Sequence, residues 1–110
     1  MTTNMEARRR MAKLLTTNAV QSRIAKLNVS TGEFCADVIE AYASDERVAH
    51  LDEREALFVC EQAARLGLSV SVENGNARLT ARGGRAALVL SVGALQSLCE
   101  SRRTEAAALP

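Results

Sequence analysis

Apolar residues recur every three or four positions through the first part of the chain, and this spacing predicts helices. Residues 5–27 carry two such patches, one of Met11, Leu14 and Leu15 and one of Val20, Ile24 and Leu27. Between them lie the polar residues 16–18, which are weak helix formers and good N-caps. We therefore expect helical structure over 5–27 with a break near residue 17.

A further helix is predicted from Ser30, where Ser30 and Glu33 have the spacing of a capping box. In this motif the serine hydroxyl accepts from the Glu33 amide while the glutamate carboxylate reaches back. The helix is expected to run to about residue 42. Its buried stripe would consist of Phe34, Val38, Ile39 and Tyr42.

The next helix is predicted over 53–66, after a short turn capped at 44–45. Asp52 is the expected N-cap, and Glu55 repeats the capping-box spacing. Gly67 is placed to end this helix in the left-handed conformation. The apolar stripe consists of Leu57, Cys60, Ala63 and Ala64.

From residue 68 onward the apolar period changes from about 3.6 to 2, which predicts strands joined by turns rich in Asn and Gly. The three expected strands are 68–73, 78–82 and 86–92. The last strand is nearly all apolar, so we expect it to be central or covered on both faces. A helix over 93–103 would close the domain. The predicted fold is α+β, with a mainly antiparallel three-stranded sheet packed with four to five helices.

Length and composition predict a single domain, because 110 residues that are 47% hydrophobic can form one packed core. We expect a basic N-terminal arm or helix start at 1–13, the domain at 14–103 and a frayed tail at 104–110.

The three cysteines lack metal-binding spacing and are expected to be reduced thiols on apolar stripes. Reduced thiols indicate a cytoplasmic protein. Neither a secretory signal nor a membrane-spanning segment is expected.

The net charge of +1 conceals an uneven distribution. Residues 1–30 carry six basic side chains and one acid, residues 31–73 carry ten acids and three arginines, and residues 74–103 carry five arginines and one acid. This asymmetry predicts two basic surfaces and an acidic one. The basic surfaces could attract phosphate, or the opposed surfaces could attract one another between subunits. An ordinary solvated shell of charge is an equally good interpretation.

The basic side chains are the candidate binding residues, because guanidinium groups match phosphate geometry. The candidates for phosphate contact are Arg78, Arg82, Arg85, Arg102 and Arg103, with Arg8, Arg9, Arg10 and Lys13 as an N-terminal group. A solvated strand face, and arginines that complement a helix dipole, would explain the same pattern. Aromatic residues make up only 3% of the chain, which argues against base stacking.

No catalytic or cofactor motif is found. His50 is the single histidine and has no Cys or carboxylate pattern of metal-binding type. Gly83-Gly84 lacks the lysine and the following helix of a phosphate-binding loop. We therefore expect a protein without enzymatic activity, cofactor or metal.

Five stretches follow one another in the order of a known family, at residues 14–23, 34–45, 63–68, 75–79 and 87–98. The third, Ala-Ala-Arg-Leu-Gly-Leu, resembles a family pattern Ala-Ala-x-Leu-Gly-Leu at a helix end. In order and spacing the five resemble the N-terminal half of the RecT family of phage single-strand annealing proteins. The chain departs from the family at Arg78, where an aromatic is usual, and at 91–94, where Ser-Val-Gly-Ala replaces Gly-Tyr-Lys-Gly.

The resemblance implies a truncated, phage-type DNA-binding protein. It would contact the backbone of single-stranded or annealing DNA without hydrolysing nucleotides, and it would assemble with further copies of itself. The alternative is a protein-interaction or regulatory module, such as a phage-type inhibitor or adaptor that binds a host or recombination protein. The acidic middle segment favours this alternative.

Overall fold

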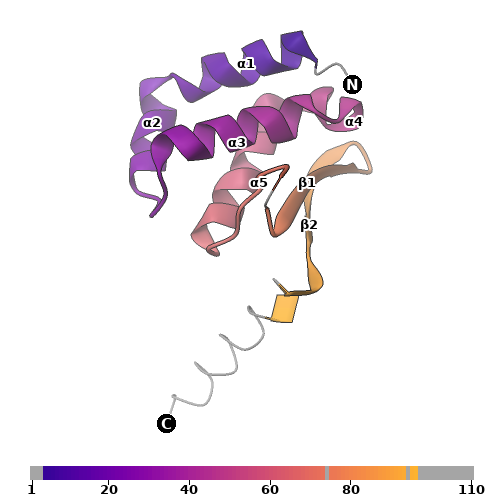
Figure 1. Ribbon diagram of the computed structural model, residues 1–110. Helices are drawn as coiled ribbons and strands as arrows, with labels where there is room; N and C mark the ends of the chain where they lie inside the picture. The colour runs from indigo at the N-terminus through magenta and orange to yellow at the C-terminus, as the bar shows by residue number, and fades with distance from the viewer. Residues whose placement is uncertain (1–3, 74, 94, 97–110) are drawn as a thin grey trace.

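The computed structural model describes residues 4–73, 75–93 and 95–96, and these residues form one α+β domain. Within these described residues, five helices are followed by one two-stranded antiparallel sheet (Figure 1). The elements are α1 (Met5–Leu15), α2 (Asn18–Ala25), α3 (Thr31–Ala43), α4 (Glu46–Ala49), α5 (Glu53–Arg65), β1 (Ala77–Arg82) and β2 (Arg85–Leu90). The predicted α+β class is confirmed.

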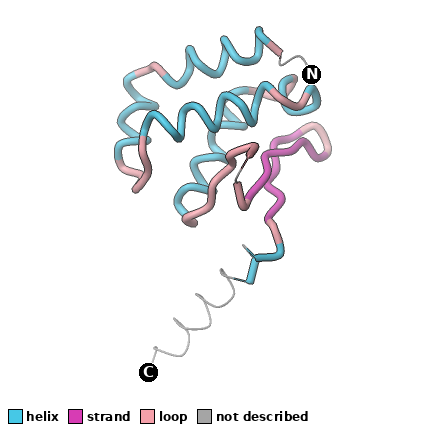
Figure 2. The backbone as a smooth tube through the Cα atoms, in the orientation of Figure 1, coloured by secondary structure: helices cyan, strands magenta, loops and turns pink. Residues whose placement is uncertain are grey.

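The helices make up most of the domain, and α1 and α3 run antiparallel beside one another (Figure 1). The Asn4 amide donates to the Ala43 carbonyl over 3.1 Å, which joins the start of α1 to the end of α3. The predicted break in the first helix is confirmed, because α1 ends at Leu15 and α2 begins at Asn18. Figure 2 shows the β1–β2 hairpin beside the helical part of the domain, where its closest neighbours are α4 and α5.

Side-chain caps begin three of the helices. Asn4 Oδ1 accepts from the Ala7 amide over 3.0 Å, Asp45 Oδ1 from Arg47 over 3.0 Å, and Asp52 Oδ1 from Arg54 over 2.9 Å. Ser30 holds the N-cap position of α3, but its hydroxyl makes no cap hydrogen bond. The capping box predicted there is therefore wrong.

The predicted left-handed end of α5 is confirmed at Gly67, which has φ of 76°. The Gly67 amide donates to Ala64 and the Leu68 amide donates to Ala63, and these two bonds together form a Schellman motif. Glycine adopts this conformation without the steric penalty that a Cβ atom brings. The chain thereby leaves α5 and turns back along α3.

The hairpin turn is also as predicted, with Gly83 and Gly84 at φ of 60° and 77°. Positive φ at both central residues is typical of a two-residue hairpin turn whose twist matches the strands. The strands pair from Arg82 opposite Arg85 to Ala77 opposite Leu90.

The predicted strand at 68–73 is not formed, so the sheet has two strands rather than three in the described part of the chain. Leu68 and Val70 are buried as expected, but the backbone of this segment makes short-range bonds. The Ser69 amide donates to the Asn76 side chain over 2.7 Å, and the Gly75 amide donates to the Ser71 carbonyl over 2.8 Å. The chain thus turns before a ladder can form, and a Cβ atom at Gly75 would lie 2.3 Å from the Ser71 oxygen.

The expectation that segment 86–92 is covered on both faces is wrong as well. Within it, β2 lies at the edge of the sheet, and the Val89 side chain opposite Arg78 is 46% exposed. The inner face of the hairpin, with Leu79 and Leu88, packs against the helical core. No helix among residues 4–73, 75–93 and 95–96 is long and apolar enough to span a membrane.

Tyr42 lies at the centre of the core and is fully buried. Its hydroxyl donates to the Leu51 carbonyl and accepts from Arg10 Nη2 over 3.2 Å. This one side chain on α3 therefore connects α1 with the segment before α5. The hydrogen bond with Tyr42 also raises the pKa of Arg10, against the opposing effect of its burial.

Candidate functional site

The arginines of the hairpin lie together on its outer face, as the alternation along the strand predicts. Residues directly opposite one another in an antiparallel pair project from the same face. Arg82 lies opposite Arg85 and Arg78 lies opposite Val89, so all three arginines share a face, and each is exposed. We call Arg78, Arg82 and Arg85 the hairpin arginine face.

Two of these arginines have acidic neighbours. Arg85 Nε contacts Glu55 Oε1 over 3.1 Å, and the same oxygen accepts from the Ala86 amide over 3.2 Å. Arg78 lines a groove of about 840 Å³ together with Asp45 and Glu46. Arg82 forms no ion pair among the described residues, so it carries the least compensated charge of the face.

The groove carboxylate Asp45 is affected by Arg78. Burial alone would raise the pKa of Asp45, but hydrogen bonds from the Arg47 side chain and amide outweigh this effect. The positive charges of Arg47 and Arg78 lower the pKa further. Asp45 therefore stays ionised and offsets part of the charge of Arg78.

Some of the N-terminal basic residues contact other elements of the domain, and the others are exposed. Arg8 is ion-paired with Glu40 on α3, and Arg10 donates to the Ala49 carbonyl over 2.6 Å. Both therefore hold α1 against its neighbours. Arg9 and Lys13 are exposed and form no ion pair among the described residues, whereas Arg102 and Arg103 lie outside those residues.

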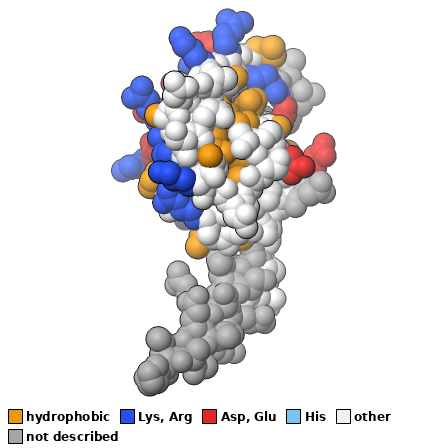
Figure 3. Space-filling view, turned by 90° about the vertical axis from the view of Figure 1, so that its left-hand side faces the viewer, with side chains coloured by type: hydrophobic (Ala, Val, Ile, Leu, Met, Phe, Trp, Pro, Cys, Tyr) orange, Lys and Arg blue, Asp and Glu red, His pale blue; other side chains and the backbone are white. Residues whose placement is uncertain are grey.

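Further exposed basic side chains lie on α1 and at the C-cap of α2, and we refer to Arg9, Lys13 and Lys26 together as the helical basic surface. Figure 3 views the molecule from the side of α2 and shows Lys and Arg side chains along its upper and left margins. The neighbouring Arg23 is ion-paired over 3.0 Å with Glu61, which is buried on α5. This pair connects α2 to α5 and removes one charge from the surface.

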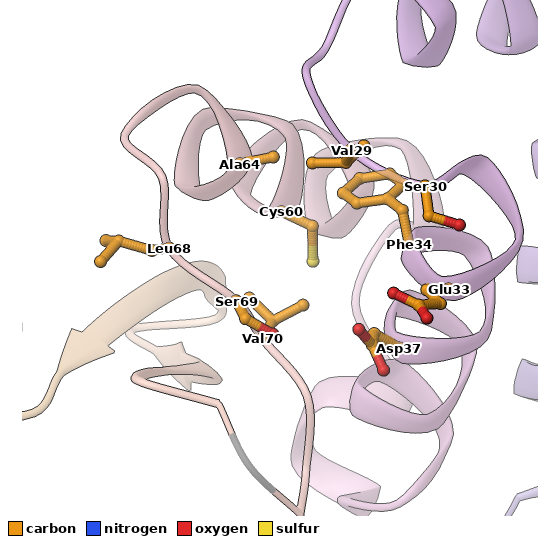
Figure 4. Close-up of a pocket in the computed structure, with 10 residues that line it drawn as sticks. All are labelled: Val29, Ser30, Glu33, Phe34, Asp37, Cys60, Ala64, Leu68, Ser69 and Val70. Atoms are coloured by element: carbon orange, nitrogen blue, oxygen red, sulfur yellow. The ribbon is translucent and has the colours of Figure 1, made fainter.

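A pocket of about 220 Å³ lies between the first turns of α3, the C-terminal half of α5 and segment 68–70. Phe34, Cys60 and Val70 contribute apolar walls, and Glu33 and Asp37 contribute carboxylates. Figure 4 shows the Cys60 sulfur directed into the space and both carboxylates entering from the α3 side. We call this space the acidic pocket.

Asp37 and Cys60 in the acidic pocket have shifted pKa values. Burial, and then the charge of Glu33, raise the pKa of Asp37. Burial and the neighbouring Glu61 raise the pKa of Cys60 to about 12, so its thiol is protonated at neutral pH. Cys60 is therefore a buried thiol, as its position on an apolar stripe predicts.

Sequence reasoning missed this pocket. The signal that could have indicated it is the spacing of Glu33 and Asp37, two like charges four residues apart on one helix face, which repel. The walls come from segments far apart in the chain, and no local pattern brings them together.

No group of three or more His, Cys, Asp or Glu side chains suited to hold a metal ion occurs within the residues that the structure describes. Comparisons of the chain with protein-family models, with curated proteins and with solved structures find no match. The function is therefore inferred from the sequence and from the geometry of the site.

Proposed function

We propose that this protein is a non-catalytic DNA-binding protein that contacts the phosphate backbone through its hairpin arginine face. The observation that carries the proposal is the pairing of Arg82 with Arg85 directly across the hairpin, where only Arg85 has a carboxylate partner among the described residues. Like charges directly opposite on a sheet destabilise it. A phosphate that bridges the two guanidinium groups would relieve this repulsion.

The chemistry of the face favours backbone contact over base recognition. Arg78, Thr80 and Arg82 supply hydrogen-bond donors along one strand, and no aromatic side chain accompanies them there. Single-strand binding by backbone contact depends on positive charge and weakens with salt, because counterions are released on binding. The resemblance to annealing proteins indicates single-stranded DNA as the first substrate to test, and self-assembly as a further part of the proposal.

The test is a fluorescence-anisotropy titration of labelled single-stranded and duplex oligonucleotides at several salt concentrations. We expect the double variant Arg78→Ala, Arg82→Ala to bind about tenfold or more weakly. Its salt slope should fall by about 1.4 for a single strand, at about 0.7 for each phosphate contact.

The variant Arg9→Ala, Lys13→Ala is the matched control, because it removes two exposed positive charges from the helical basic surface. If this variant loses binding and the hairpin variant does not, DNA binding belongs to the exposed basic residues of α1 instead. No binding by the wild-type protein at low salt, where attraction is strongest, would refute the proposal.

A second candidate function, a protein-interaction module, is favoured by the open edge of β2. The Ser91 amide donates to Asn76 across the sheet, and antiparallel hydrogen bonds alternate. The amides of Leu88 and Leu90 therefore point away from β1, and neither has a backbone partner among the described residues. Such an edge can pair with a strand of another chain, and Val89 and Val92 beside it are 46% and 72% exposed.

A further inference from the structure

The acidic pocket combines an apolar interior with negative charge that nothing in the described chain compensates. Glu33 and Asp37 lie four residues apart on α3, and neither forms an ion pair with a Lys or Arg of the described residues. Phe34 beside them is buried. Glu33 is exposed and Asp37 is half-buried, and two like charges four residues apart on a helix repel one another.

Cys60 extends the apolar side of the pocket. Its side chain is 1% exposed, makes no hydrogen bond to another described residue and points into the pocket (Figure 4). The thiol behaves as a small, polarisable apolar group, and it lies opposite the α3 side from which the carboxylates enter. The pocket thus has a charged side and a polarisable apolar side, a combination typical of sites for small amphipathic ligands.

We propose that the acidic pocket binds a small organic cation, with an ammonium or guanidinium group at Glu33 and Asp37 and an apolar body against Phe34, Cys60 and Val70. A metal ion fits less well, because a protonated thiol is a poor ligand and two carboxylates leave its coordination incomplete. The volume of about 220 Å³ limits the apolar body to a single ring or a short aliphatic chain, since a cavity of about 150 Å³ already accepts benzene.

The same chemistry could come from a free amine or from a lysine side chain of a peptide, and two probes separate these sources. Benzylamine represents the free amine, and N-acetyl-lysine amide represents the side chain. Benzyl alcohol is the neutral match of benzylamine, and benzoate is the anionic match. Binding would be followed by the shifts of the Phe34 and Val70 amide signals in nuclear magnetic resonance titrations.

We expect saturable binding of benzylamine at least about tenfold tighter than that of benzyl alcohol, and no binding of benzoate, because charge-assisted hydrogen bonds are stronger than neutral ones. Glu33→Gln and Asp37→Asn should each weaken benzylamine binding severalfold. Glu46→Gln, which removes an exposed carboxylate outside the pocket, should leave it unchanged. Tighter binding of the lysine amide than of benzylamine would assign the site to a peptide ligand.

Two outcomes would overturn the proposal. The first is equal binding of benzylamine and benzyl alcohol, or no binding of either. The second is unchanged benzylamine affinity in the folded variants Glu33→Gln and Asp37→Asn. Neither outcome depends on DNA, so this test stands apart from that of the hairpin arginine face.

Discussion

At the scale of single residues, the carboxylates near the start of α3 lack the ion-pair partners that Glu40 and Glu61 have among the described residues. Glu61 is buried but ion-paired with Arg23, and Arg8 is ion-paired with Glu40. Asp37 has no such partner among the described residues, and Glu33 lies one turn away on the same helix. The contrast identifies Asp37 as the carboxylate whose neutralisation should help the fold.

We predict that Asp37→Asn is more stable than the wild type at neutral pH. Burial and Glu33 raise the folded-state pKa of Asp37, so the folded protein holds that proton more tightly than the unfolded chain does. Protonation of Asp37 stabilises the folded protein fully below the pKa of this group in the unfolded chain. This stabilisation is lost as the pH rises through the folded-state pKa. Asn resembles the neutral form at every pH.

The measurement is urea unfolding of both proteins across a pH series. The advantage of the variant should be present at pH 7 and should shrink as pH falls toward and below about 4, the ordinary pKa of Asp. Glu46→Gln serves as a control for the removal of an exposed negative charge. A variant less stable than the wild type at pH 7 would show that the Asp37 carboxylate is stabilised by its surroundings.

At the scale of elements, the two capping-box sequences differ in what their cap side chains do. Asp52 accepts from the Arg54 amide over 2.9 Å, whereas the Ser30 hydroxyl makes no cap bond. The glutamates also turn away from their caps, because Glu55 binds Arg85 and Glu33 lines the acidic pocket. The capping-box sequence therefore marks where each helix begins, but it does not determine which side-chain hydrogen bonds form there.

We predict that Asp52→Ala lowers the free energy of unfolding by about 1 kcal/mol, the usual loss for a working N-cap. Ser30→Ala should change it by less than about 0.5 kcal/mol, because no cap bond is lost. Chemical denaturation of both variants tests the pair. Equal losses would mean that the Ser30 hydroxyl does cap α3 in solution.

The elements that depend on local preferences could be predicted from the sequence, and those that depend on tertiary packing could not. The break near residue 17, the end of α5 at Gly67 and the turn at Gly83-Gly84 depend on local preferences, and all three are confirmed. The strand at 68–73 depends on a ladder with β1, and the Asn76 side chain competes for the Ser69 amide there. The acidic pocket depends on tertiary packing, so only the spacing of its two carboxylates was visible in the sequence.

At the scale of the whole molecule, folding brings basic residues from both ends of the sequence into ion pairs with the acidic middle segment. Arg8, Arg23 and Arg85 each form an ion pair with an acid from the middle segment. The hairpin arginine face and the helical basic surface keep exposed positive charge, and Arg47, Arg54 and Arg65 of the middle segment are exposed as well. The open edge of β2 lies beside the first of these, so assembly through that edge would extend one continuous arginine-bearing sheet.

We predict that Leu88→Pro abolishes any self-association through β2. Proline removes the amide that points away from β1, and it leaves the hydrogen bonds between the strands in place. Leu88→Ala is the matched control, because it removes the same side chain but keeps the amide. Sedimentation velocity should show assembly of the wild type and Leu88→Ala only. A monomeric wild type, or an assembling Leu88→Pro, would contradict this use of the edge.

The position of Tyr42 has a spectroscopic consequence. It is the one tyrosine of a chain that contains no tryptophan, and it is fully buried with its hydroxyl engaged by Arg10 and Leu51. The near-ultraviolet absorption and emission of the protein therefore report almost entirely on a single phenol at the junction of α1, α3 and α5. The unmodified chain carries its own optical probe, and its signal follows the integrity of the core rather than of the surface.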